Sequence, residues 1–102
     1  MDLIKPITSF YNCDTSKNSI FELAKSCNNQ GVVYCWLNQI NNKSYVGSSV
    51  NLTVRLYKYY SFRHLESSRR PIEKSLLKYG YSNFSFHLLE YCKNVECIDR
   101  EQ

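Results

Sequence analysis

The sequence predicts an α+β domain in which a small three-stranded antiparallel sheet is flanked by helices, in the order β-β-α-α-β-α. Two runs rich in β-branched and aromatic residues, 32–37 and 44–47, are separated by a polar stretch and predict a hairpin. Two later segments place apolar residues three and four positions apart, which is typical of helices. A segment starting at Phe84 largely alternates apolar and polar residues and predicts the third strand. The chain has 102 residues, which is enough for one small domain.

The predicted hairpin brings two tyrosines onto neighbouring strands. Its connection contains Asn41-Asn42, and asparagine tolerates the positive φ of a tight turn. Because successive side chains of a strand point to opposite faces, Tyr34 and Tyr45 share one face if the register is right. Gly47, at the end of the second strand, permits a close backbone approach. Two strand tyrosines that pack on one face are also common in proteins without a catalytic role.

The first helix of the central pair is expected to begin after the polar stretch 48–51, whose side chains can act as N-caps. Leu52, Leu56 and Tyr60 then recur at four-residue spacing. Arg55 and Tyr59 are also four apart, so they share a neighbouring face of this helix. Residues 61–70 are polar and basic and are expected to form a loop.

The second helix is expected to be capped by Ser68, to have Pro71 in its first turn and to stop at Gly80. Its predicted buried stripe consists of Ile72, Leu76 and Leu77. A last helix is expected after the third strand, beginning near Asn94.

Residues 1–30 are expected to form a leader that is irregular apart from a short helix over 17–28. The leader is either a remnant of a preceding reading frame or an arm that packs on the domain, and the sequence does not decide between them. Residues 31–102 are expected to form the functional domain.

Positive charge is concentrated in the middle of the chain. Residues 43–78 carry eight basic and two acidic residues, a net charge of +6, whereas the chain as a whole has +4. Several tyrosines are interleaved with these basic residues, a composition typical of a phosphate-facing surface. The same composition also describes a solvated basic helix face that binds nothing.

The five cysteines form no C-x-x-C pair, which favours buried thiols in a reducing compartment over disulfides or a zinc site. His64 and His87 are expected to be structural. The longest apolar run, Val32–Leu37, is far shorter than the ~20 residues that span a bilayer. The N-terminus resembles neither a signal peptide nor a transit peptide.

Several short motifs occur in an order that resembles a known nuclease family. They are Val32-Val33-Tyr34, Tyr45-Val46-Gly47, Asn51-Leu52-x-x-Arg55, Lys78-Tyr79-Gly80, Asn83-Phe84 and Asp99-Arg100-Glu101-Gln102. This order resembles the GIY-YIG nucleases, most closely the homing endonucleases encoded in fungal mitochondrial introns. Two features depart from the family pattern: Val32 replaces its first glycine, and the chain stops where relatives continue, so residues 31–102 are expected to be a C-terminally incomplete catalytic domain.

The resemblance implies an endonuclease that uses Mg²⁺ to hydrolyse phosphodiester bonds of double-stranded DNA. Such hydrolysis needs an activated water, stabilisation of charge on the phosphate and protonation of the leaving oxygen. By resemblance, Tyr34 orients or deprotonates the water, Tyr45 holds the phosphate, and Tyr59 assists proton transfer. Arg55 grips a phosphate oxygen, and Glu101 holds the metal. Taken alone, Arg55 and Glu101 are also ordinary helix-surface charges.

The DNA-binding surface is expected to use basic side chains and the serines after Gly47. These residues are Lys43, Ser48, Ser49, Arg55, Lys58, Arg63, Arg69 and Arg70. The alternative to a nuclease is a truncated or vestigial module of the same fold that binds nucleic acid without cutting it, or an organellar protein whose likeness is only inherited. The resemblance also implies a mitochondrial location, because a protein encoded inside the organelle needs no transit peptide.

Overall fold

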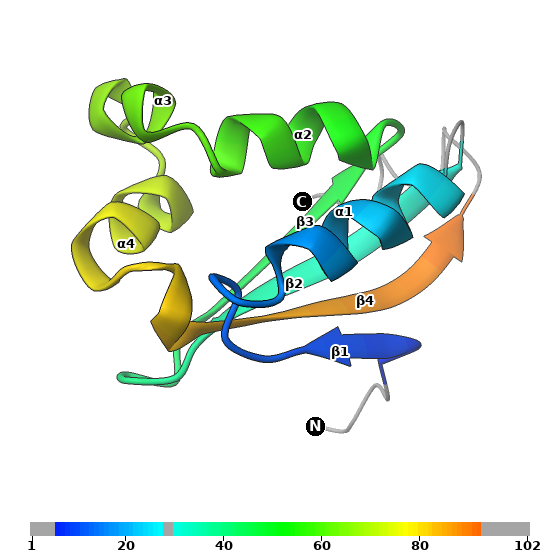
Figure 1. Ribbon diagram of the computed structural model, residues 1–102, viewed down its shortest axis with the longest axis horizontal. Helices are drawn as coiled ribbons and strands as arrows, with labels where there is room; N and C mark the ends of the chain where they lie inside the picture. Colours follow the sequence, from blue (N-terminus) through cyan, green and yellow to red (C-terminus); the bar gives the residue numbers. More distant parts are fainter. Residues whose placement is uncertain (1–5, 28–29, 93–102) are drawn as a thin grey trace.

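The computed structural model describes residues 6–27 and 30–92, which form one antiparallel sheet with helices on one side (Figure 1). The strands lie in the order β1-β4-β2-β3. Their bounds are β1 Thr8–Phe10, β2 Gly31–Asn38, β3 Ser44–Ser49 and β4 Phe84–Cys92. The helices are α1 Lys17–Ser26, α2 Leu52–Tyr59, α3 Phe62–Ser67, α4 Pro71–Tyr79 and the short 3₁₀-helix η1 Tyr81–Asn83.

The α+β class is confirmed, but the predicted three-stranded sheet and the element order are wrong. The described residues run β-α-β-β-α-α-α-β, with η1 ahead of β4. The additional strand is β1, which pairs with β4 through Thr8 opposite Leu88 and Phe10 opposite Phe86. Three residues are too few to show an alternating pattern, so β1 depends on the β4 edge for its conformation. The helix expected near Asn94 lies outside the described residues.

The hairpin register places the two motif tyrosines on the same face, as predicted. Tyr34 lies opposite Gly47, and Trp36 lies opposite Tyr45. Residues two apart on β2 share a face, so Tyr34, Trp36, Tyr45 and Gly47 all point to the helix-covered side. Asn42 has the positive φ expected of the turn, at 62°. The core on this side contains fully buried aromatic and aliphatic side chains from β2 and β4: Val32, Tyr34, Trp36, Phe84, Phe86 and Leu88.

Helix α2 agrees with the predicted helix. It buries Leu52, Leu56 and Tyr59, and the Asn51 side chain accepts a hydrogen bond from the Val54 amide at 3.2 Å. The expected polar loop that follows contains α3, whose first turn is capped by Ser61. Helix α3 has six residues and buries only Leu65. It shows too little apolar periodicity to be detected from sequence.

Helix α4 starts at Pro71 and ends at Gly80, as predicted, and Gly80 has a φ of 86° that favours glycine. The N-cap residue and part of the buried stripe of this helix differ from the prediction. The N-cap is Arg70 and not Ser68, because Ser68 instead accepts the Arg70 amide and donates to Glu73. Leu77 is 38% exposed, whereas Glu73 and Ser75 are buried.

The described part of the leader packs on the domain, as expected of an arm. Cys13, Ile20, Ala24 and Cys27 are buried in the same core as the sheet. On the opposite face of the sheet, the β1 residue Ser9 and the β4 residue His87 share a hydrogen bond of 2.7 Å. His87 is thus structural, and its burial lowers its pKa. The three cysteines described with their side chains, Cys13, Cys27 and Cys35, are buried free thiols.

The leader is attached to the helices through two half-buried phenols. Tyr60 donates to the Cys13 carbonyl at 2.7 Å and stacks on Tyr81, with ring centroids 4.6 Å apart. Tyr81 in turn donates to the Tyr59 carbonyl at 2.6 Å. Burial raises the pKa of Tyr81 to about 12 and the pKa of the Cys13 thiol to about 12, and it also raises the pKa of Tyr60.

We expect these shifts to make the protein less stable in alkali. Each group stays protonated in the folded state but ionises near its ordinary pKa, 9 to 10, when the chain unfolds. The unfolded state therefore binds fewer protons, and the free energy of unfolding falls as the pH rises from about 9 towards 12, by up to about 1.4 kcal/mol per pH unit for a fully shielded group. Urea unfolding between pH 8 and pH 11, followed by the fluorescence of the buried Trp36, tests this. A stability that stays constant over that range would contradict it.

No helix within the described part of the chain is both long and apolar enough to cross a membrane.

Candidate active site

A pair of buried tyrosines forms the centre of the candidate site. The hydroxyl groups of Tyr34, on β2, and Tyr59, on α2, are 2.8 Å apart and share a hydrogen bond. Their exposed fractions are only 1% and 3%. The Tyr34 ring stacks on the Phe86 ring, and the Tyr59 ring packs edge-on against the Tyr34 ring. Two sequence-predicted site residues, 25 positions apart in the chain, are therefore brought into direct contact.

Gly47 is required at its position because the Tyr34 ring lies against it. A Cβ atom built on Gly47 would be 2.8 Å from the Tyr34 hydroxyl oxygen and 2.9 Å from Cζ. Contacts this short force a shift of one of the two strands or of the ring. The close approach expected at Gly47 is confirmed, although Gly47 lies within β3, which continues to Ser49.

Two arginines lie close enough to Tyr59 to act on it electrostatically. Burial raises the pKa of Tyr59, while the Tyr34 hydroxyl and the positive charges of Arg55 and Arg70 oppose the shift and Glu73 adds to it. The net direction is upward, so Tyr59 is a neutral phenol near pH 7. Arg55 is half-buried and Arg70 is exposed, so both residues near the Tyr34–Tyr59 phenol pair are in contact with solvent.

The buried carboxylate of Glu73 is a feature that the sequence analysis missed. Glu73 is 1% exposed, its Oε2 atom lies 3.0 Å from His64 Nε2, and its Oε1 atom accepts a hydrogen bond from Ser68. These contacts join α3, the loop that follows it and α4. The spacing of nine residues between His64 and Glu73 crosses a helix, a loop and a second helix start, so no local pattern reveals the contact.

We expect His64→Ala to destabilise the fold by about 1–3 kcal/mol, because it leaves a buried carboxylate with one partner fewer. The His64 side chain is 37% exposed, which keeps the effect below that of a fully buried ion pair. Glu66→Ala removes an exposed side chain from the same helix and should change stability by less than about 0.5 kcal/mol. Urea unfolding of both variants measures the difference. Equal stabilities would show that Glu73 does not need His64.

Tyr45 lies on the same face as Tyr34, half-buried and next to Gly47 in the pleat of β3. It packs at the edge of the core rather than in the phenol pair. Its side chain is therefore near the site but more accessible than that of Tyr34.

The predicted DNA-binding residues separate into two groups. Lys58, Arg63, Arg69 and Arg70 are exposed on α2, α3 and the following loop, on the same side of the sheet as the phenol pair. Lys43 is exposed at the hairpin end, roughly 13 Å of strand away from Gly47.

The structure does not bring the Ser48 side chain to the site. Ser48 lies opposite Val33, so it points to the other face of the sheet, and it is 3% exposed. Ser49 is on the Tyr34 face, but its hydroxyl accepts the Asn51 amide at 3.0 Å at the start of α2. The prediction that Ser48 contacts DNA is therefore not supported by its orientation.

The described residues do not supply a metal site by themselves. Among residues 6–27 and 30–92, no group of three histidine, cysteine, aspartate or glutamate side chains could hold an ion. Among the described residues, the carboxylate of Glu73 is close enough to act electrostatically on Tyr59, and it is already bound to His64 and Ser68. Glu101, the predicted metal ligand, lies outside the described residues.

Comparison with known proteins agrees with the motif order. The family model described as "GIY-YIG catalytic domain" matches residues 30–102. A curated relative, "Probable intron-encoded endonuclease 1" of Neurospora crassa, is 32% identical over 88 residues, which covers 84% of this chain but 27% of the relative. The chain thus spans about a quarter of that relative's length, and the match extends into the leader. No solved structure matches significantly.

The family match contains every motif that forms the described site. It includes the hairpin with Tyr34 and Gly47, helix α2 with Arg55 and Tyr59, and the end of α4. The resemblance drawn from those motifs is confirmed, and the chain belongs to the GIY-YIG family.

Proposed function

We propose that this protein is a Mg²⁺-dependent DNA endonuclease of the homing type, with its catalytic domain in residues 31–102. The observation that carries the proposal is the hydrogen-bonded pair of Tyr34 and Tyr59, with the positive charges of Arg55 and Arg70 close enough to act on Tyr59. Two phenols and two guanidinium groups at one place suit a phosphodiester, whose hydrolysis increases the negative charge on the phosphate oxygens.

In this proposal each side chain has a distinct task. Arg55 binds a non-bridging phosphate oxygen through charge-assisted hydrogen bonds, which strengthen as negative charge develops. Because Tyr59 is neutral near pH 7, it does not act as a preformed phenolate base, and its hydrogen bond to Tyr34 would position the Tyr34 phenol to orient the attacking water. Tyr45 contacts the phosphate from the accessible edge of the site.

Glu101 is the proposed ligand of Mg²⁺. A bound magnesium ion would supply positive charge at the phosphate and lower the pKa of a coordinated water. Mg²⁺ retains several waters, so a single carboxylate together with phosphate oxygens is a sufficient set of ligands. The remaining basic residues, Lys58, Arg63 and Arg69, are proposed to hold the DNA backbone, which fixes position without reading sequence.

A plasmid-nicking assay tests this function. We expect the purified chain to nick supercoiled plasmid in Mg²⁺ and not in EDTA, and we expect Glu101→Ala to remove the activity. Glu66→Ala, which removes an exposed carboxylate from α3, should cut normally. Salt-sensitive DNA binding by a folded protein without nicking would instead identify a non-catalytic binding module of the same fold.

The mitochondrial location is proposed on the same grounds. The Neurospora relative is described as intron-encoded, and it is 32% identical to this chain over 88 residues. Fractionation of cells that produce the protein, with detection in purified mitochondria, tests the location.

A further inference from the structure

A groove between α1 and α2 lies apart from the phenol pair. It encloses a volume of about 440 Å³, and its walls include Lys17, Phe21 and Lys25 of α1 together with Tyr57 and Tyr60. A second hollow of about 350 Å³ shares Lys25 and continues past Asn51 and Thr53 at the start of α2. A cavity of several hundred Å³ is large enough for a nucleotide-sized ligand.

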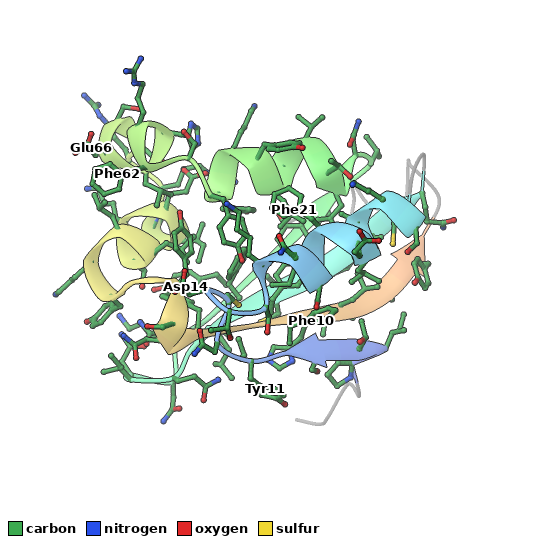
Figure 2. The ribbon with its side chains drawn as sticks, in the orientation of Figure 1. Phe10, Tyr11, Asp14, Phe21, Phe62 and Glu66 are labelled. Carbon is green, nitrogen blue, oxygen red and sulfur yellow. The ribbon has the colours of Figure 1, made fainter. Side chains whose placement is uncertain are left out.

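One wall of this α1–α2 groove is aromatic. The Phe21 ring lies 5.0 Å from the Tyr57 ring and 5.6 Å from the Tyr60 ring, so it lies between the two helices and forms part of the groove wall (Figure 2). Tyr57 remains 62% exposed. Its ring contacts Phe21 at a tilt of 50° and is otherwise largely open to solvent, which makes it available for stacking.

The groove is also positively charged. The Lys17 ammonium group lies 5.3 Å above the Tyr60 ring, and Lys25 lines the groove two turns further along α1, about 12 Å away by helix rise. The nearby carboxylates Asp14 and Glu22 are not among the lining residues. Two ammonium groups spaced along an aromatic wall match a strand that carries a phosphate at each nucleotide.

We propose that the α1–α2 groove binds single-stranded nucleic acid, with a base stacked on Tyr57 and backbone phosphates on Lys17 and Lys25. A duplex keeps its bases inside the helix, so an exposed aromatic ring can stack only on an unpaired base. Stacking on an aromatic platform tolerates any base, so the groove is expected to bind without sequence preference.

The position of the groove relates it to the proposed nuclease without making it part of the family's catalytic unit. Helix α2 carries Arg55 on one flank of its buried face and Tyr57 on the other, so a strand that leaves Arg55 can cross α2 to reach the groove. The α1 wall precedes residue 30, where the family match begins. The choice of a cut DNA strand as the occupant rests on the proposed function, whereas the binding chemistry does not.

Fluorescence anisotropy with a 5′-labelled twelve-nucleotide single-stranded DNA, in EDTA, tests the proposal. We expect Tyr57→Ala to weaken binding by roughly five- to a hundredfold, the range seen when a stacking ring is removed. Phe62→Ala is the matched control, because Phe62 is 64% exposed on α3 and should be neutral. The double variant Lys17→Gln/Lys25→Gln should reduce the slope of log affinity against log salt by roughly 1.4, whereas Lys74→Gln/Lys78→Gln should not.

The same oligonucleotide as RNA and as a DNA duplex completes the experiment. Weaker binding of RNA than of DNA supports a cut DNA strand as the occupant, and equal binding supports the groove as a general single-strand site. Unchanged affinity in both Tyr57→Ala and the lysine pair overturns the proposal, as does an equal loss of duplex binding in Tyr57→Ala. This experiment measures binding and not cutting. A protein that does not nick plasmid can therefore still confirm the groove, and a protein that nicks plasmid but shows unchanged affinity in these variants is a nuclease that does not use the groove.

Discussion

Arg55→Ala should lower plasmid nicking by at least roughly a hundredfold while the protein remains folded, the loss typical of removing one donor that stabilises a transition state. The Arg55 side chain is half-buried at the flank of α2, and the buried face of this helix consists of Leu52, Leu56 and Tyr59. Truncating Arg55 therefore leaves the core intact. The loss of its charge near Tyr59 removes the guanidinium group that is proposed to bind the phosphate.

Two other variants separate the role of Arg55 from general attraction to DNA. Lys58→Ala removes a positive charge from the exposed side of the same helix and should weaken DNA binding, with little effect on the rate at saturating DNA. Arg55→Lys keeps the charge but loses the planar two-pronged hydrogen bond, so it should restore only part of the activity. If Arg55→Ala cuts DNA at the normal rate, Arg55 is not required for cleavage and Arg70 alone is sufficient.

The hairpin and its tyrosines were predictable because strand alternation has a period of two. Once β2 and β3 are recognised, Tyr34 and Tyr45 must share a face when the register aligns Tyr34 with Gly47. The contact between Tyr34 and Tyr59 was not predictable from strand alternation or from any other local sequence pattern. It depends on how α2 packs across the sheet, which neither the spacing of Tyr59 from Arg55 nor any other local pattern determines.

The missed elements share a physical cause. Strand β1 and helix α3 are short, and each is held by partners distant in sequence or by a cap, such as β4 for Thr8–Phe10 and Ser61 for α3. Glu73 was missed because a carboxylate is normally a surface residue, and its burial is stabilised by hydrogen bonds with His64 and Ser68. Patterns of hydrophobicity predict elements that bury apolar faces, and they give no signal for a buried charge with partners.

Gly47→Ala should disrupt the phenol pair and reduce both stability and nicking. The added methyl group would lie within 3.1 Å of the Tyr34 hydroxyl oxygen, Cζ and Cε1. The ring has little room to move away, because it stacks on Phe86 at a centroid distance of 5.6 Å and its hydroxyl is bonded to Tyr59. We expect a loss of about 1–3 kcal/mol in the free energy of unfolding, the usual cost of overpacking a core, together with a loss of cutting.

A double-mutant cycle identifies the Tyr34 ring as the cause. Tyr34→Leu removes every ring atom that the new methyl group would meet, so Gly47→Ala should cost little more in that background. Urea unfolding, followed by the fluorescence of Trp36, gives the four free energies that the cycle needs. An equal cost of Gly47→Ala in both backgrounds would mean that the strand itself, and not the tyrosine above it, requires glycine. Coupling of more than about 1 kcal/mol between the two substitutions would show that position 47 requires glycine because the Tyr34 ring lies against it.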